Sequence, residues 1–400
     1  MKPCHLCRSL EVNPILDLGP QPICNRFLSS ADAEEFEFPM TIGVCHHCGL
    51  VQIASPVPPV ELTPRFDWIT YNEPERHLDG LAEFISRLPG LDEGPVVAGV
   101  SFKDDSMLAR MNRLGFQHSW RIDPESDLKA PRPGVGVESI QDRLTPGAAE
   151  AAAKRYGPAD IVLARHILEH AHHPMQFMEA VRKLARPDGY IVFELPDCQR
   201  ALESGDYSTI WEEHVIYFTP ETFRTALAYG GFPLAHFESQ PYPLENCLIA
   251  VVKARNLQAP PLLAASMVRS EVRRAVNFGK ALAATRKKWA DFLSDFRQRQ
   301  GGIAVFGAGH LACSFINLLG LREYVEFVVD DNSHKRGLFM PGSRLPILES
   351  PSLVERKIKL CLLCLSPESE EKVMQRNRAF VEGGGSFASV FPASHHALVI

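Results

Sequence analysis

The sequence predicts a multidomain α/β protein in which a small cysteine-rich β domain precedes two parallel-sheet units. Three observations support this prediction. The 400 residues exceed what one compact core usually contains, cysteine pairs frame residues 4–48, and short apolar strands alternate with amphipathic helices further on. We therefore place domains at residues 1–70, 71–257 and 301–400, with a helical linker at 258–300.

The composition is that of an ordinary globular protein. The chain is 45% hydrophobic and 22% charged, and its net charge of −6 provides no general basic field for nucleic acid. No apolar run is long enough to span a bilayer, and the N-terminus lacks the apolar stretch of a secretory signal. We expect a cytoplasmic protein with no nucleic-acid or membrane partner, and the sequence does not determine its oligomeric state.

Two CxxC pairs are the most specific motif of the N-terminal domain. They are Cys4 with Cys7, and Cys45 with Cys48. Each pair bends the backbone so that both sulfurs face one point, and four such sulfurs form the tetrahedral shell that structural zinc prefers. We predict a Zn²⁺ ion with no open position for catalysis. The alternatives are isolated thiols, a redox pair, or substitution of a ligand by His46 or His47. Short β-like runs at 40–44 and 50–53 predict a small sheet around the site.

The next two hundred residues alternate between helix-like and strand-like segments. Helices are predicted at 81–88, 106–114, 148–156 and 175–185, and strands at 95–100, 120–123, 160–163 and 189–194. Strands that alternate with helices in this way predict a parallel sheet.

A long basic stretch at 265–300 leads into a second α/β unit. The stretch could be a nucleic-acid arm, but its apolar residues recur at helical spacing among acids, which favours a solvated helix or linker. Strands are predicted at 303–306, 325–329, 360–365 and 387–390. Cys361 and Cys364 form a further CxxC, but residues three apart in a strand face opposite sides, so we interpret both as core residues.

Polar motifs in the central unit resemble those of a known family. Residues 164–170 read Ala-Arg-His-Ile-Leu-Glu-His after a buried strand, and residues 211–218 read Trp-Glu-Glu-His-Val-Ile-Tyr-Phe. Together with the cysteine pairs and the turn at 307–309, they resemble the deoxysugar C-methyltransferases over nearly the whole chain. That resemblance implies a zinc domain, a class I methyltransferase domain that binds S-adenosylmethionine (SAM), and a C-terminal Rossmann-like domain.

The resemblance also implies a reaction and its residues. The family methylates the carbon beside the ketone of a nucleotide-linked keto sugar, which needs a base for the carbon-bound proton and donors for the enolate. His214 matches the family's base, Glu213 stands beside it, and His170 matches a second active-site histidine. Alternatively, His214 is a core histidine paired with Glu213, and His170 only ends a helical turn. We interpret His166 as a surface or helix-start residue.

The loop expected to bind SAM departs from the family pattern. Gly99 falls where the family has an acid, and Ser101 and Asp105 replace its two glycines. By resemblance, Gly99, Ser101, Asp104 and Asp123 would contact the cofactor, Asp123 through the ribose. The alternative is a family member that binds no SAM and acts as an epimerase-like or non-catalytic nucleotide-sugar-binding protein.

The substrate side also differs from the family. Trp211 stands where the family has tyrosine, and the upstream aromatic segment contains Trp68 and Tyr71. In the C-terminal domain, a turn after a strand opens a helix, an arrangement that suits phosphate. The expected nucleotide-sugar contacts there are Gly307, Gly309, Asp330 and Lys335. The alternatives are a domain that serves only packing, or an oxidoreductase that binds NAD at this turn.

Overall fold

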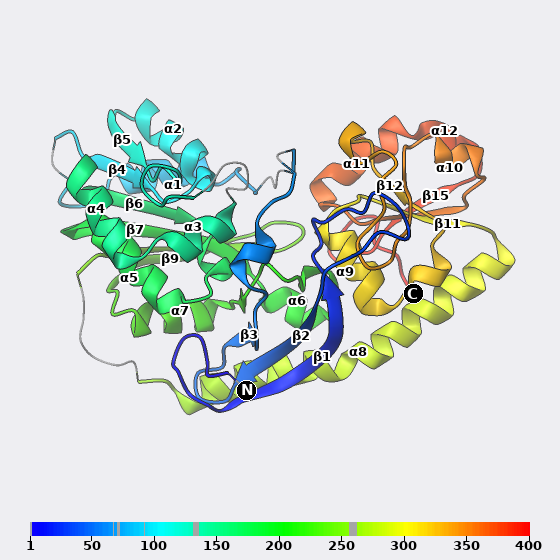
Figure 1. Ribbon diagram of the computed structural model, residues 1–400, viewed down its shortest axis with the longest axis horizontal. Helices are drawn as coiled ribbons and strands as arrows, with labels where there is room; N and C mark the ends of the chain where they lie inside the picture. Colours follow the sequence, from blue (N-terminus) through cyan, green and yellow to red (C-terminus); the bar gives the residue numbers. More distant parts are fainter. Residues whose placement is uncertain (1, 67, 70–72, 92, 131–135, 256–261) are drawn as a thin grey trace.

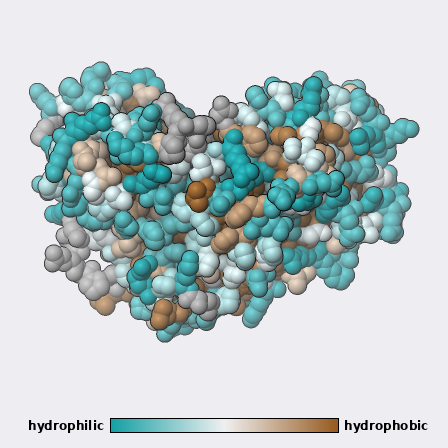
Figure 2. Space-filling model, in the orientation of Figure 1, coloured by the Kyte–Doolittle hydropathy of each residue, from teal (hydrophilic) through white to brown (hydrophobic). Residues whose placement is uncertain are grey.

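The computed structural model describes residues 2–66, 68–69, 73–91, 93–130, 136–255 and 262–400. Figure 1 shows two α/β lobes side by side, with the N-terminal strands between them and one long helix beneath. In Figure 2 the outline of the molecule is notched between the two lobes. Tyr71, a predicted substrate contact, lies outside the described residues. No helix among the described residues is long and apolar enough to cross a membrane.

The N-terminal sheet is built from two distant parts of the chain. Its order is β1-β2-β3-β8, and all pairings are antiparallel. The first three strands are β1 (Val12–Pro22), β2 (Glu37–Cys45) and β3 (Val51–Ile53). The short 3-10 helix η1 (Pro59–Leu62) follows them. The fourth strand, β8 (Ile216–Tyr217), comes from the central segment. The strands predicted near 40–44 and 50–53 are therefore confirmed.

The central sheet has the order β5-β4-β6-β7-β10-β9. Its strands are β4 (Val96–Gly99), β5 (His118–Arg121), β6 (Ala159–Arg165), β7 (Ala185–Asp197), β9 (Leu234–Gln240) and β10 (Asn246–Lys253). The pairings among β4 to β7 are parallel, which confirms the prediction, whereas β9 and β10 pair antiparallel. Every residue of β6 is buried, as expected for a strand covered on both faces.

Helices cover both faces of this sheet. The first, second, fourth and fifth of those named next match the four predicted helices to within a few residues. They are α1 (Leu78–Ser86), α2 (Asp105–Arg113), α3 (Val137–Arg143), α4 (Pro146–Tyr156), α5 (Pro174–Leu184), α6 (Gln199–Ser204) and α7 (Pro220–Tyr229). The helix α4 begins two residues before the predicted start at 148, because the Thr145 side chain caps it by accepting a hydrogen bond from the Ala148 amide. Short 3-10 helices are η2 (Phe102–Asp104), η3 (Leu168–His170) and η4 (Tyr207–Thr209).

The helix α8 (Ala265–Arg299) is 35 residues long and runs beneath both lobes. It contacts β1, β2, α6 and α9. One stripe of side chains is buried, including Phe278, Leu282 and Leu293, while most of its basic residues face solvent. It is therefore amphipathic, as predicted, and it packs against several parts of the molecule.

The C-terminal sheet is parallel, with the order β13-β12-β11-β14-β15. Its strands are β11 (Ile303–Phe306), β12 (Val328–Val329), β13 (Ile347–Leu348), β14 (Leu360–Leu363) and β15 (Ser386–Ser389). Its helices are α9 (His310–Leu319), η5 (Arg322–Tyr324), η6 (Ser333–Lys335), α10 (Ser352–Glu355), α11 (Pro367–Arg376) and α12 (Arg378–Glu382). Cys361 and Cys364 are buried in two different core clusters, which confirms them as packing residues.

Candidate functional site

The four N-terminal cysteines converge on one point. Their sulfurs all lie within 4.8 Å of one another, with 3.7 Å from Cys4 to Cys48 and 3.6 Å from Cys7 to Cys45. Four thiolates at about 2.3 Å from a tetrahedral Zn²⁺ ion would be roughly 3.8 Å apart, so the donor set fits this metal. His46 and His47 are exposed and outside the cluster, which leaves the coordination shell to the cysteines.

The N-terminal sheet positions the segment that carries His214. Strand β8 begins two residues after His214, and the Ile53 amide donates a hydrogen bond to the Val215 carbonyl oxygen. Within the segment, the Trp211 amide donates to the Tyr217 hydroxyl, which donates in turn to the Trp211 carbonyl oxygen. His214 is therefore fixed between a strand of the N-terminal sheet and a closed loop.

Three aromatic rings lie around the predicted base. His214 meets His170 edge to face, with 4.8 Å between ring centroids, and lies 4.9 Å from Trp211. His310, the first residue of α9, stacks on Trp211 at 4.2 Å. The His214 side chain is only partly buried, whereas His170 and Trp211 are buried. The structure thus brings together three predicted site residues, and His310 from the C-terminal domain is one that the sequence analysis missed.

Burial, followed by the charges of His170 and His310, lowers the pKa of His214 well below its usual value. The imidazole is therefore neutral at neutral pH and has a lone pair that can accept a proton. Burial likewise lowers the pKa of His310 to about 4, so this ring is uncharged against Trp211.

Two buried acids precede His214, and the N-terminal domain holds both. The Asn25 amide nitrogen donates to Glu213, and the Cys24 backbone amide donates to Glu212 at 2.6 Å. Burial, followed by the charges of Glu138 and Glu212, raises the pKa of Glu213 well above its usual value. Asn25 and Glu138 carry no sequence motif, so only the fold reveals their place in the site.

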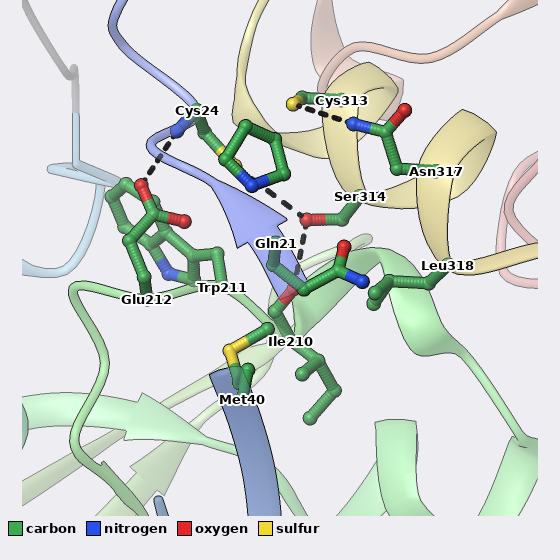
Figure 3. A pocket seen from close by; sticks show the side chains of 11 residues that line it. Gln21, Cys24, Met40, Ile210, Trp211, Glu212, Cys313, Ser314, Asn317 and Leu318 are labelled. Atoms are coloured by element: carbon green, nitrogen blue, oxygen red, sulfur yellow. Dashed lines mark hydrogen bonds between the residues drawn. The ribbon is translucent and has the colours of Figure 1, made fainter. Parts of the chain in front are cut away.

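A small cavity behind Trp211 marks where the three domains meet (Figure 3). Its volume is about 10 Å³, roughly the space for one water. Cys24, Trp211 and Ser314 line it, and the Ser314 hydroxyl donates to the Ile210 carbonyl oxygen at 2.7 Å. The interface that supports Trp211 is therefore closely packed.

In the loop after β4, a carboxylate of the loop itself accepts the hydrogen bonds of the loop amides. Asp104 is completely buried, and it accepts hydrogen bonds from the amides of Val100 and Ser101 at 2.8 Å and of Arg165 at 3.0 Å. Its predicted role as a free cofactor ligand is corrected, because the carboxylate satisfies amides that glycines would have left open. Ser101 is also buried, and its hydroxyl accepts from the Lys103 amide.

The other predicted cofactor residues lie at neighbouring strand ends. Gly99 ends β4, where a Cβ atom would lie 3.0 Å from Asp104 and Leu108. Asp123 follows β5, is half-buried, and accepts a hydrogen bond from the Ser126 amide at 2.7 Å. Parallel strands that end side by side, with an acid after the second, suit a nucleoside ligand. The assignment of Asp123 to SAM stays a prediction, whereas the complete burial of Asp104 does not fit a cofactor contact.

The prediction that His166 is a surface or helix-start residue is wrong, because the residue is buried and precedes the N-cap residue of η3. His166 is 5% exposed, has a positive φ of 47°, and approaches Glu194 to 3.1 Å. Glu194 also pairs with the buried Arg165. In the sequence, the polar residues that directly follow a buried strand could have revealed this network. Polar side chains at the carboxyl ends of parallel strands lie at one edge of the sheet and can therefore meet.

The predicted phosphate contacts of the C-terminal domain bind one another. The Asp330 carboxylate accepts from the Ala308 amide at 3.0 Å and from Lys335 at 2.8 Å. The Lys335 ammonium also donates to the Ala308 carbonyl oxygen at 2.6 Å. Asp330 and Lys335 therefore stabilise the turn itself, which corrects their assignment as nucleotide-sugar ligands, Asp330 for a ribose hydroxyl and Lys335 for the diphosphate.

The two glycines of this turn have different surroundings. Gly307 has a φ of 104°, and a Cβ atom there would lie 2.8 Å from the Cys364 carbonyl oxygen, so the turn itself requires glycine. Gly309 opens α9 and has no atom within 4 Å of its Cβ position. Trp68 stacks on His334 at 5.4 Å, which brings this predicted substrate residue to the same domain.

Three family models match the chain in series. They are described as "Putative zinc binding domain" over residues 4–62, "Methyltransferase domain" over 69–236 and "C-methyltransferase C-terminal domain" over 265–392. C-methyltransferase NovU from Streptomyces niveus is 22% identical over 402 residues, and the match covers 97% of this chain and 95% of NovU.

Solved structures resemble part of the chain. The 1,6-didemethyltoxoflavin-N1-methyltransferase of Burkholderia thailandensis is 14% identical, with 45% of this chain and 78% of that chain covered and a TM-score of 0.29. A SAM-dependent methyltransferase from Aquifex aeolicus is 15% identical, with 46% and 94% covered and a TM-score of 0.29.

Proposed function

We propose that this chain, which family models match in its zinc-binding, methyltransferase and C-terminal segments and which is similar to C-methyltransferase NovU, methylates the carbon beside the ketone of a nucleotide-linked keto-deoxysugar. The observation that most supports this is the setting of His214. Its partly exposed imidazole is held between His170 and Trp211 and follows the buried acid Glu213. SAM, when bound, would supply the methyl group as an electrophile.

In this proposal His214 acts as the base. Its neutral nitrogen takes the proton from the carbon beside the ketone, and the electron pair of that C–H bond moves towards the ketone oxygen to give an enolate. Glu213 and His170 orient the substrate or stabilise the charge on that oxygen, which is worth most where water is excluded. Trp211 and His310 close one side of the site and limit entry of water.

We propose the residues that bind SAM and the nucleotide-sugar from where they lie in the structure. SAM would be held by Asp123 and the loop at Gly99 and Ser101, at adjacent strand ends. The nucleotide-sugar would extend towards the C-terminal domain, where Gly309 leaves room at the start of α9 and Trp68 offers an aromatic surface.

One observation favours a second candidate, an epimerase-like activity without SAM. The amides of the loop after β4 already bond to Asp104, and the Arg165–Glu194 pair fills the neighbouring strand ends. His214 would still exchange the same proton, and the enolate would be reprotonated rather than methylated.

Incubation of a nucleotide-linked 4-keto-6-deoxysugar with the protein in heavy water separates these candidates. With SAM present, mass spectrometry should detect a methylated product, and without SAM it should detect deuterium at the carbon beside the ketone. His214→Asn should slow this exchange by about a hundredfold or more, whereas His395→Asn, an exposed histidine, should not. Exchange without any methylation would favour the second candidate, and exchange that survives His214→Asn would remove this residue as the base.

A further inference from the structure

A second group of metal-ligating side chains lies in the site, apart from the four cysteines. Glu138, His170 and Glu213 each offer one ligand atom, and these atoms all lie within 4.8 Å of one another. The His170 Nδ1 atom is 3.0 Å from Glu138 Oε1. The residues come from α3, η3 and the loop before β8, so the fold gathers them from three separate elements.

The burial of this group calls for a positive charge. Glu138, His170 and Glu213 are 4%, 6% and 4% exposed. Two carboxyl groups buried side by side are unfavourable unless a proton or a cation lies between them. A shared proton would satisfy the carboxyl pair, but it would leave His170 Nδ1 with only its ion-pair contact to Glu138 Oε1 at 3.0 Å. That atom is buried and has no aligned hydrogen-bond partner among the described residues.

The surroundings also favour an ion. Asn25 donates a hydrogen bond to Glu213, which orients its carboxylate as outer-shell partners of metal ligands do. Gly136 leaves room for Glu138, because a Cβ atom at that position would lie 2.7 Å from Glu138 Oε2. We propose that Glu138, His170 and Glu213 bind a divalent metal ion, distinct from the thiolate-bound zinc.

The ligand set indicates which ions fit and what they would do. One imidazole and two carboxylates suit Mn²⁺, Fe²⁺ or Zn²⁺ rather than a thiol-seeking ion. Three protein ligands leave at least one position open, as in catalytic rather than structural sites. This role rests on the proposed function: the open position would take the ketone oxygen, and polarisation of the carbonyl would make the proton facing His214 more acidic.

Metal binding by the full-length protein tests the site without any substrate. The protein is treated with EDTA, its metal content is measured by mass spectrometry, and Mn²⁺ is added while its free signal is followed by electron paramagnetic resonance. Mn²⁺ prefers carboxylate and imidazole to thiolate, so it does not report on the four-cysteine site. Two other groups of the described residues could also hold an ion, Glu169 with His170 and His214, and His77 with Glu194 and Cys247, and a Glu138 variant separates the proposed site from both. We expect one bound Mn²⁺ per chain in addition to the zinc.

Glu138→Gln removes one ligand and keeps the shape of the side chain, so it should weaken Mn²⁺ binding by roughly tenfold or more. Glu212→Gln is the matched control, because Glu212 is equally buried and lies beside Glu213 but outside the ligand set. It should leave Mn²⁺ binding unchanged.

The inference is overturned if the wild-type protein contains only the thiolate zinc and binds no Mn²⁺, as a shared proton would predict. It is also overturned if Glu138→Gln binds Mn²⁺ as tightly as wild type. Neither result would affect the proton-exchange test of His214, so failure of the metal site and failure of the proposed function are distinguishable.

Discussion

At the scale of single residues, the polar side chains that the sequence singles out fall into two groups, those that meet at the site and those that bond to nearby backbone amides. His170, Trp211 and His214 meet around one partly open site. Asp104 instead turns back onto the amides of its own loop, and Asp330 accepts a hydrogen bond from the Ala308 amide in the glycine turn after β11. The physical reason is that amides of a buried turn must find an acceptor, and a carboxylate close by in the fold competes with any ligand for them.

Asp104→Ala should destabilise the protein by about 2–4 kcal/mol, because two or three buried amides lose their acceptor. Urea denaturation followed by circular dichroism measures this. Asp105→Ala is the control, since its carboxylate is 55% exposed and pairs with Arg121 at the surface, so its effect should stay below about 1 kcal/mol. Similar small losses for both variants would contradict the structural role of Asp104.

Glu73 should make the free energy of unfolding fall as the pH is lowered. Burial alone would raise the pKa of Glu73, but the charges of His166 and Lys103 lower it to about 2, below its ordinary value of 4.5. A carboxyl with a lowered pKa in the folded state contributes stability above the unfolded-state pKa and loses it as the pH falls towards the folded-state pKa.

Glu73→Gln should therefore be less stable than wild type near pH 7, and the difference should shrink between about pH 4.5 and pH 2. Urea midpoints of both proteins at several pH values measure this difference. A gap that stays constant down to about pH 3 would contradict the ion pairs assigned to Glu73. Glu75→Gln, whose side chain is 45% exposed, serves as the control.

At the scale of elements, the crossing of α8 over β1 shows how packing overrides local preference. Gly279 lies in the middle of α8, where alanine would favour the helix by about 1 kcal/mol. A Cβ atom at Gly279, however, would lie 2.2 Å from the Ile15 carbonyl oxygen in β1. The sequence pattern predicts the helix, but the strand it touches explains this glycine.

Gly279→Ala should consequently destabilise the protein by about 1–3 kcal/mol despite its better helix propensity. Asn277→Ala, two residues away on the exposed side of the same helix, should be neutral or slightly stabilising. Thermal unfolding of both variants measures the contrast. If Gly279→Ala raised the melting temperature, the close contact between α8 and β1 would be wrong.

At the scale of the whole molecule, the zinc-binding domain and the proposed base share one sheet. Strand β3 of that domain pairs with β8, just after His214, and its Asn25 contacts Glu213. The domain therefore supports the site even though its metal has no open position. Loss of zinc should disturb His214 while the central sheet remains folded.

A Cys4→Ser, Cys48→Ser double variant tests this coupling. Metal analysis should show loss of the zinc, because two of its four ligands are removed. Hydrogen exchange should lose protection in β3 and β8 but keep it in β6 and β7, whose pairing does not involve the N-terminal domain. Retention of one zinc per chain would refute the ligand set, and uniform loss of protection would refute the separate stability of the central sheet.

The sequence by itself determined the features that depend on local pattern. The spacing of Cys4, Cys7, Cys45 and Cys48 predicted their cluster, and the alternation of apolar segments predicted the parallel strands and most helices. Both are short-range signals, because a knuckle turn or a helical face is encoded within a few neighbouring residues.

Only the tertiary structure decided which polar residues meet. Asn25, Glu138, Glu213 and His310 belong to four distant segments and carry no common motif, yet they surround one site. The same holds for Asp104 and Lys335, whose partners include backbone groups that the sequence cannot place. Contacts between distant segments depend on how whole elements pack, and that packing is set by the complete core rather than by any local pattern.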